Sequence, residues 1–425
     1  MQAGTGAQPP GEACPVVLVA QYLPIFELVL PVWRELRRRG VPVVVVVTPY
    51  PSDDPSAEAP FLDADAAVLW KQLVGMGIDP LPMVPADQEA DRIRSLSPCA
   101  VFLSGPYDAQ RHAGLAAESL GLPIHYVNYF FRVVPDDPQV HPAASSNPFY
   151  RHCAAIYCET PYDVEMFLGA GVDESALVMS GHPGLDAYDE PQELEERPTV
   201  LWCPWHVEVW PSGRRGYATF VDGRAAMLAE ARRRPHIDFV FRPHPLLLTH
   251  MRLFQWWTPE EESQFWGEFD SIPNLSYHDA DVVTHVPQLS SAWAMVTDGI
   301  AFFPAFAYTG KPLLLTKAPG NPGWNSVGLA IEELVATSTF MDGLPDFLDE
   351  VEQGIDPAEV ERRHQQMRVV LGRPEQSSAS VVADHLVSVR RVAVAARPSA
   401  VQESTGVLRG WTRLFSSRGR TRADA

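Results

Sequence analysis

Phe-Val-Phe-Arg-Pro-His-Pro (239–245) and Val-Thr-Asp-Gly-Ile-Ala (296–301) share one design: an apolar run that ends in polar residues. Short apolar runs bounded by turn residues are typical of buried strands in a parallel sheet. In open α/β sheets ligands bind beyond the carboxyl ends of the strands, often with an anion at the start of the next helix. We therefore expect both segments to lead into one ligand site, which we interpret as a grip for the phosphates of an activated donor.

The same alternation of strands and helices begins near the N-terminus. Val16–Ala20 predicts a buried strand, Phe26–Arg39 a helix that stops at Gly40, and Val43–Thr48 a second strand. Together they form a βαβ unit of the doubly wound type. The turn at Gln21–Pro24 lacks Gly-x-Gly-x-x-Gly, which argues against a dinucleotide-dependent dehydrogenase. Further strands are expected at Ala100–Leu103, Ile124–Asn128, Ala155–Cys158 and Val178–Ser180, and helices at Ala109–Leu120 and Pro161–Gly169.

A second α/β series follows an acidic, proline-containing segment. Its expected strands are Thr199–Cys203, Ile237–Arg242, Leu275–Tyr277, Met295–Thr297 and Pro312–Thr316, with a helix at Arg224–Arg233. A chain of 425 residues favours two such domains facing a cleft. We expect a mobile lead (1–13), an N-terminal domain (14–186), a linker (187–198), a C-terminal domain (199–372), a terminal helix within 373–396 (Glu375–Arg391) and a basic tail (397–425).

Composition limits the class of protein. With 46% hydrophobic and 20% charged residues the chain is globular, and its net charge of −20 argues against a nucleic-acid partner. The five cysteines are scattered without zinc-ligand spacing, so we expect reduced thiols in a cytoplasmic protein. No signal-peptide pattern and no apolar run of membrane-spanning length are present. We expect no metal and no cofactor.

The charge is unevenly distributed, because the last 36 residues hold eight arginines and only two acidic residues. In the segment Gly406–Arg420 the apolar residues fall on one helical face, with arginines on the other side. This pattern predicts an interfacial helix on an anionic membrane surface, which would place the protein peripherally on the inner membrane face. The alternative is a disordered basic tail without a specific partner.

Arg242 and His244 are the first candidate site residues. Pro243 and Pro245 restrict the backbone around them, which helps to aim both side chains at one point. A histidine can donate a hydrogen bond to a phosphate oxygen or transfer a proton, and an arginine offers a planar fork to the same anion. The alternative is a structural loop in which the histidine bonds a backbone carbonyl.

Thr297 and Asp298 stand between a strand and an apolar helix. Either side chain can cap that helix, and the backbone N–H groups of Gly299, Ile300 and Ala301 can receive a phosphate. Glycine at 299 would let the backbone approach a ligand closely. Because Asp298 would repel a diphosphate, we expect it to cap the helix or contact a nucleoside.

Other residues have weaker claims. His206 follows the strand that ends at Cys203 and is placed to face the cleft. His125, Glu27 and His206 are the candidates for a general base, while His182 and most remaining histidines read as structural. Lys311 opens a strand and is expected to be a solvated edge residue.

These features resemble the CDP-glycerol glycerophosphotransferases of teichoic acid synthesis. Arg-Pro-His-Pro (242–245), a strand ending in Thr-Asp (297–298) and Gly-Lys-Pro-Leu-Leu (310–314) follow that family's order. Trp202–Trp205 resembles its aromatic proline turn, and Gly181–Asp186 the motif that closes its first domain. The similarity covers about 148–329.

The resemblance implies a GT-B fold of two Rossmann-like domains, with donor phosphates at His244 and a donor-binding turn from Thr297 onward. This chain has Gly299-Ile-Ala where the family has Tyr-Ser-Ser, and Asn128-Tyr-Phe in place of its Trp-His-Gly.

The resulting hypothesis is a transferase that moves an alditol phosphate or sugar from a nucleotide-diphosphate donor such as CDP-glycerol to the hydroxyl of a polymer or lipid-linked acceptor. His244, Arg242 and the amides of 299–301 would neutralise the leaving phosphate. Two alternatives remain open. One is a nucleotide-sugar glycosyltransferase or UDP-sugar 2-epimerase, and the other is a catalytically silent relative that binds a nucleotide.

Overall fold

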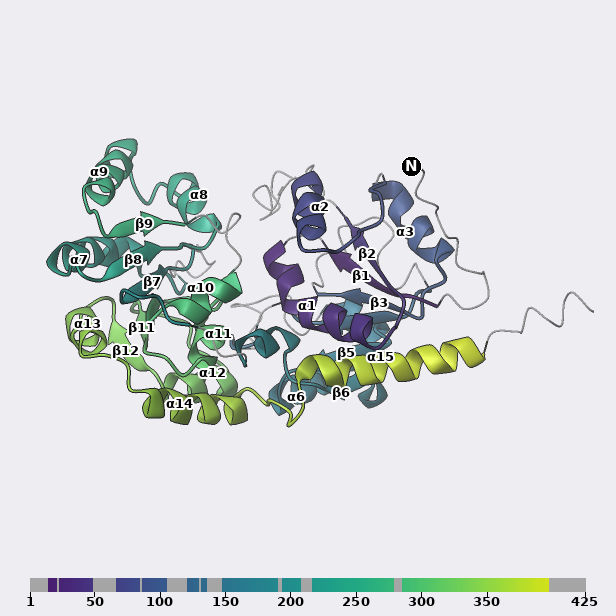
Figure 1. Ribbon diagram of the computed structural model, residues 1–425. Helices are drawn as coiled ribbons and strands as arrows, with labels where there is room; N and C mark the ends of the chain where they lie inside the picture. The colour runs from purple at the N-terminus through teal and green to yellow at the C-terminus, as the bar shows by residue number, and fades with distance from the viewer. Residues whose placement is uncertain are drawn as a thin grey trace, which may run out of the picture.

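The computed structural model describes residues 14–20, 23–48, 66–84, 86–104, 121–129, 131–135, 147–189, 193–207, 216–278 and 285–396. Its strands form two six-stranded parallel sheets, with the orders β2-β1-β3-β4-β5-β6 and β12-β11-β10-β7-β8-β9. Each sheet lies in its own lobe, with helices packed around it, and the yellow helix α15 runs along the first lobe (Figure 1). The predicted helix 109–120 and the tail 397–425 lie outside the described residues.

The first lobe is built from the N-terminal part of the chain. Its strands are β1 (Val16–Ala20), β2 (Val43–Val47), β3 (Ala100–Leu103), β4 (Ile124–Val127), β5 (Ala155–Cys158) and β6 (Leu177–Met179). Its helices are α1 (Leu23–Arg38), α2 (Ala66–Gly75), α3 (Ala86–Ser95) and α6 (Pro161–Gly169), with 3-10 turns η1 (Pro148–His152), η2 (Glu174–Ala176) and η3 (Pro183–Tyr188). All five residues of β1 are buried, as its place inside the sheet requires.

The second lobe repeats this plan. Its strands are β7 (Thr199–Cys203), β8 (Asp238–Phe241), β9 (Leu275–Tyr277), β10 (Ala294–Thr297), β11 (Leu313–Lys317) and β12 (Ala336–Thr339). Its helices are α7 (Phe220–Arg233), α8 (Leu246–Leu253), α9 (Pro259–Asp270), α10 (His285–Ser291), α11 (Phe303–Tyr308), α12 (Ser326–Glu332), α13 (Leu344–Glu352) and α14 (Pro357–Val370). An aromatic core that includes Trp202, Phe220 and Phe241 fills one face of this sheet.

The chain returns to the first lobe through α15 (Ser378–Ala395), which packs against α1 and shares a core with β1 and β3. The expected helix over 375–391 therefore starts three residues later. Asp186 explains this start, because its carboxylate accepts hydrogen bonds from the backbone N–H groups of Ser378 (3.0 Å) and Ala379 (2.8 Å).

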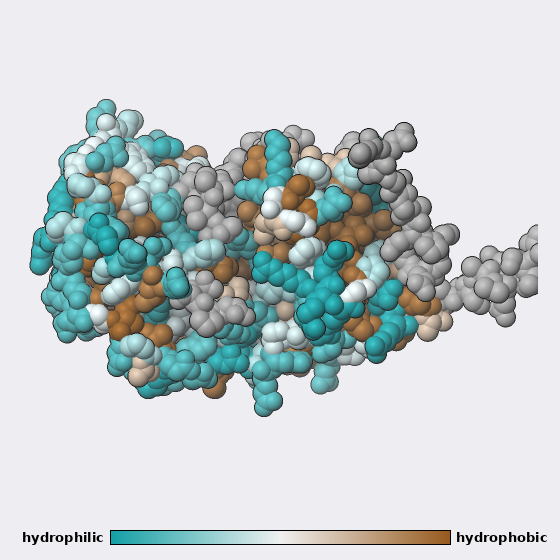
Figure 2. Space-filling model, in the orientation of Figure 1, coloured by the Kyte–Doolittle hydropathy of each residue, from teal (hydrophilic) through white to brown (hydrophobic). Residues whose placement is uncertain are grey.

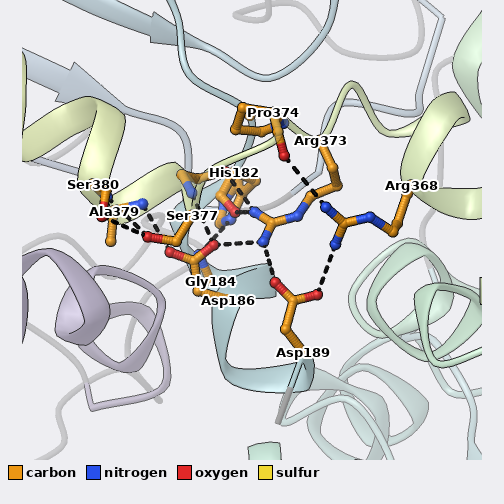
Figure 3. Close-up of polar contacts among 12 residues, drawn as sticks. His182, Gly184, Asp186, Asp189, Arg368, Arg373, Pro374, Ser377, Ala379 and Ser380 are labelled. Carbon is orange, nitrogen blue, oxygen red and sulfur yellow. Dashed lines mark hydrogen bonds and ion pairs between the residues drawn. The ribbon is translucent and has the colours of Figure 1, made fainter. Parts of the chain in front are cut away.

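Arg373 links the two chain segments that run between the lobes (Figure 3). Its guanidinium lies 2.6 Å from Asp186 and 2.5 Å from Asp189, and Arg368 pairs with the same Asp189 at 3.1 Å. The Arg373 side chain is almost completely buried. A buried arginine between two carboxylates joins the end of η3 to the segment before α15. The segment that leaves the first lobe and the segment that returns to it are therefore bound to each other.

No helix among the described residues is long and apolar enough to cross a bilayer.

Candidate functional site

The carboxyl edge of the second sheet brings the predicted site residues together. Strands β10, β7 and β8 are adjacent and parallel, with Thr297 paired to Cys203 and Trp202 paired to Phe241. The segments that follow these strands therefore emerge side by side. The polar ends of the two opening segments follow β8 and β10, which flank β7, so both reach the same edge of the sheet.

Trp205, His206 and His244 form a cluster of mutually tilted rings at this edge. The ring centroids of Trp205 and His244 lie 4.3 Å apart, those of His206 and His244 4.5 Å, and those of Trp205 and His206 4.7 Å. Both histidines were predicted for the site, but their direct contact was not. The contacts with Trp205 and His206 fix the orientation of the His244 ring.

His244 is held as a hydrogen-bond donor. Its Nδ1 accepts the backbone N–H of Leu246 at 3.2 Å, so the proton of the neutral ring sits on Nε2. Burial of the imidazole lowers the pKa of His244 to about 3, with a smaller contribution from the charge of His250. The residue nevertheless keeps some accessible surface. A neutral imidazole with a fixed Nε2–H suits hydrogen bonding to an anion, and it is not a base at neutral pH.

His250, on α8, is a site residue that the sequence reading missed. Its Nδ1 lies 2.8 Å from the carbonyl oxygen of Val207, so this nitrogen must carry a proton. The same nitrogen is 3.2 Å from Nδ1 of His206, which is therefore an acceptor. Burial lowers the pKa of His206 well below its usual value. The helical position of His250 offered no signal, because nothing in the sequence shows that α8 folds back over the turn after β7.

Arg242 does not point to the same place as His244. Its Nη1 donates to Oε1 of Gln288 on α10, and its guanidinium lies over the ring of Phe302 with 5.0 Å to the centroid. The side chain is 1% exposed. The structure thus places Arg242 against α10 and His244 against Trp205, instead of aiming both at one anion.

Asp298 links two segments of the second lobe. Its carboxylate accepts the N–H of Trp205 at 2.5 Å and the hydroxyl of Thr219 at 2.8 Å, which links the turn after β7 to the start of α7. Burial raises the pKa of Asp298 to about 6. Neither Asp298 nor Thr297 caps the next helix, because α11 begins at Phe303. Thr297 instead donates to the carbonyl oxygen of Cys203 at 2.7 Å.

The turn at 299–301 is shaped by Trp205. A Cβ atom on Gly299 would lie 2.5 Å from Cβ of Trp205. Glycine at this position therefore lets the Trp205 side chain pack closely against the backbone. Ile300 is buried in the second-lobe core, and Ala301 is partly exposed. The backbone after Thr297 is a turn and not the first turn of a helix, which weakens its case as a helical anion site.

The first lobe contributes Glu27, from α1, to this region. Its carboxylate lies 2.7 Å from Nδ1 of His285 on α10, and both residues are buried. Tyr188 is close to this pair, since the charges of Glu27 and Arg242 both act on its hydroxyl, while burial raises its pKa. No hydrogen-bond partner for that hydroxyl is found in the described part of the chain. We call Glu27, Tyr188, Arg242 and His285 the interlobe cluster.

Two predicted candidates lie elsewhere. His125 is buried in the first lobe, where its Nδ1 is 3.0 Å from the Tyr157 hydroxyl, which also contacts Nδ1 of His385 on α15 at 3.0 Å. Burial lowers the pKa of His125 to about 3. His182 is structural, as expected: its Nε2 donates to the Asn128 carbonyl oxygen at 3.0 Å.

Lys311 corrects another prediction. The expected solvated edge residue is buried, and its ammonium donates to the carbonyl oxygens of Leu289, Ser290 and Ala292 at 2.8, 2.7 and 2.6 Å. These carbonyls end α10, where a cation is favoured by the helix dipole. Lys311 therefore fixes the helix that carries His285 and Gln288.

In the described ranges no three histidine, cysteine or carboxylate side chains gather as metal ligands would. No protein-family model matches the chain, and no curated protein is similar to it in sequence.

Solved structures do match. UDP-GlcNAc 2-epimerase from Neisseria meningitidis, bound to UDP-GlcNAc, superposes with a TM-score of 0.57 at 13% identity over 88% of this chain and 99% of that one. A putative UDP-N-acetylglucosamine 2-epimerase from Listeria monocytogenes gives 0.61 at 13% identity, over 88% and 96%. The chain adopts the GT-B fold. MnaA from S. aureus, solved with UDP, gives 0.57 at 14% identity over 91% and 99%. The predicted fold class, two Rossmann-like doubly wound units, is thereby confirmed.

Proposed function

We propose that this chain is an enzyme acting on a nucleoside-diphosphate sugar, with UDP-sugars as the favoured class. The observation that carries the proposal is the fixed Nε2–H of His244 at the carboxyl edge of the second sheet. A donor with defined orientation suits a diphosphate, which is the shared part of all such substrates. Solved structures of the same fold were determined with UDP-GlcNAc and with UDP, which supports uridine over cytidine.

The interlobe cluster supplies the acid–base groups of the proposed site. Glu27 and His285 come from opposite lobes and lie 2.7 Å apart, and we propose that the sugar of a substrate whose diphosphate contacts His244 lies at this pair. A buried carboxylate in contact with an imidazole is a pair that can exchange a proton with substrate. Of the three base candidates from sequence, Glu27 has the most suitable position, while His125 is enclosed in the first lobe.

We also propose the domain division 14–186 and 199–372, with 187–198 as linker and 373–396 returning to the first domain. It is supported by the two separate sheets and by the packing of α15 on α1.

The test is a ligand panel on the full chain. Isothermal titration with UDP, UDP-GlcNAc, CMP and CDP-glycerol should show binding to the uridine compounds, and UDP-GlcNAc should then be followed by NMR without an acceptor. Inversion at C2 would establish a 2-epimerase, and sugar release that needs an added hydroxyl acceptor would establish a transferase. Binding to CDP-glycerol with none to UDP compounds would instead support the glycerophosphotransferase reading, whose Arg-Pro-His-Pro motif is present at 242–245. Binding to none of them would overturn the proposal.

A further inference from the structure

Arginines gather at one place in an otherwise acidic chain. Residues 34–41, at the end of α1, and 384–391, in α15, contain six arginines and only two carboxylates, Glu35 and Asp384. We call the six the arginine patch: Arg34, Arg37, Arg38, Arg39, Arg390 and Arg391. The whole chain has 33 basic and 53 acidic residues, so this region reverses the general sign of charge. Hydrophilic side chains cover α1 on the face shown in Figure 2.

A cavity lies within the arginine patch. It measures about 430 Å³ and is lined by Arg39, Arg390 and Arg391, with Val41 and Val387 as apolar lining. One of its arginines is held rigidly, because Arg39 lies 2.5 Å from Asp384 and 2.7 Å from Glu35. The Nε of Arg390 donates to the carbonyl oxygen of Cys14 at 3.2 Å. The cavity is therefore a preformed basic depression between two helices.

Three other arginines of the patch form no ion pair within the described fold. Arg34, Arg37 and Arg391 are exposed, and none of them forms an ion pair with the residues that the structure describes. Of the three, Arg391 lines the cavity, and Arg34 and Arg37 lie on α1 close in sequence to Arg39, which also lines it. These unpaired cations leave a positive field that no ion pair in the described fold neutralises.

Apolar side chains continue the same helix toward its end. Val392 is 68% exposed and Val394 is 36% exposed, directly after Arg390 and Arg391. Exposed valines flanked by arginines match the composition of a surface that lies at a lipid headgroup boundary, where the cations meet phosphates and the apolar groups enter the outer acyl region.

We propose that the arginine patch docks on an anionic phospholipid surface, with a headgroup phosphate in the cavity. Guanidinium groups match phosphate oxygens as a planar fork, and several neighbouring cations together attract a charged bilayer. Nucleic acid is disfavoured by the acidity of the remaining surface. The surface is distinct from the interlobe cluster, since Glu27 and Arg37 lie on the same helix about 15 Å apart along its axis. The inference does not depend on the proposed function.

Vesicle co-sedimentation of the full chain tests the docking. Vesicles of phosphatidylcholine alone should leave the protein in solution, and vesicles with about 30% phosphatidylglycerol should bind it. The variant R34E/R37E/R391E should lower the partition coefficient by roughly fivefold or more for each arginine changed, since each cation near the surface contributes about that factor. Its substitutions break no ion pair of the described fold.

The charge-matched control is K71E/R232E/R362E, which makes the same change in net charge at exposed cations of α2, α7 and α14. Arg232 and Arg362 form surface ion pairs with Glu268 and Glu359, whose loss costs little stability. It should retain most of the binding, while circular dichroism shows both variants folded. Equal loss in both variants would show a general charge effect, and unchanged binding in the patch variant would assign attachment to another part of the chain; either result overturns the proposal. Displacement by millimolar inorganic phosphate would do the same, because the cavity would then take a free anion.

Discussion

Glu27 and His285 form a buried polar contact between the two lobes, with 2.7 Å between the carboxylate and Nδ1. Glu27 lies in α1 of the first lobe, and His285 is the first residue of α10 in the second. The contact therefore joins the two Rossmann-like units directly beside Tyr188 and Arg242. A polar contact at this position can both hold the lobes together and act on a bound substrate.

The first prediction concerns the strength of this pair. Glu27→Ala and His285→Ala should each lower the free energy of unfolding by about 2 kcal/mol, because each change leaves the other buried polar side chain without this contact. The double variant should cost less than the sum, because each single change already removes the shared contact. Urea denaturation of the three variants measures the coupling. Additive losses would mean that the two side chains do not interact in solution.

His244 carries the second prediction. His244→Ala should weaken binding of the nucleoside diphosphate by about 10- to 100-fold, because one hydrogen bond to a charged group is lost. With the pKa of His244 lowered to about 3, its contribution should not titrate between pH 5.5 and 8. His236→Ala, at an exposed histidine of the same lobe, is the control. An unchanged dissociation constant for H244A, measured by calorimetry, would remove His244 from the site.

The fold was largely predictable from the sequence, and the site was only partly so. Apolar runs bounded by turn residues predicted strands such as Thr199–Cys203 and the helix Pro161–Gly169 at their observed bounds. Such local patterns determine which segments are buried and in what order. They do not determine where long side chains go after a strand ends. Arg242 contacts Gln288 and His244 contacts Trp205, and these two partners come from distant parts of the chain.

The third prediction uses His182, whose pKa burial lowers to about 4. Its Nε2 donates to Asn128 and its Nδ1 accepts from the N–H of Gly184, so protonation would disrupt the second contact. The unfolded chain binds this proton near pH 6.5 and the folded chain near pH 4. The stability that the neutral His182 contributes is therefore complete above pH 6.5. The unfolding free energy then falls by about 1.4 kcal/mol per pH unit as the pH drops toward 4.

His182→Gln should reduce the pH dependence of the unfolding free energy by the amount that corresponds to about one proton bound on unfolding. This holds whatever the effect of the substitution on stability at pH 7.5. Denaturant titrations at pH 7.5, 5.5 and 4.5 give the slope for both proteins. His236→Gln, at the surface, should leave it nearly unchanged. If wild type and H182Q lose stability in parallel, the buried imidazole is not a source of the acid sensitivity.

Lys311 carries the fourth prediction. Lys311→Met keeps an unbranched side chain of similar volume but leaves three carbonyls at the end of α10 without their donor. We expect a loss of about 2 kcal/mol in unfolding free energy and weaker ligand binding, because α10 carries His285 and Gln288. Lys317→Met, at a partly exposed pair with Glu332, should cost less than about 1 kcal/mol. Equal losses in the two variants would contradict a special role for Lys311.

The last prediction separates backbone strain from close packing. Gly40 and Gly310 have similar positive φ angles, 69° and 75°, but only Gly310 is enclosed: an added Cβ would press against the carbonyl oxygen of Val360 in α14. Gly40→Ala meets no atom within 4 Å and should cost about 1 kcal/mol, from the left-handed backbone alone. Gly310→Ala must also move α14 away from α11, so we expect a loss above about 3 kcal/mol. Thermal and urea unfolding of both variants measure the difference, and similar costs would show that α14 yields freely at this contact.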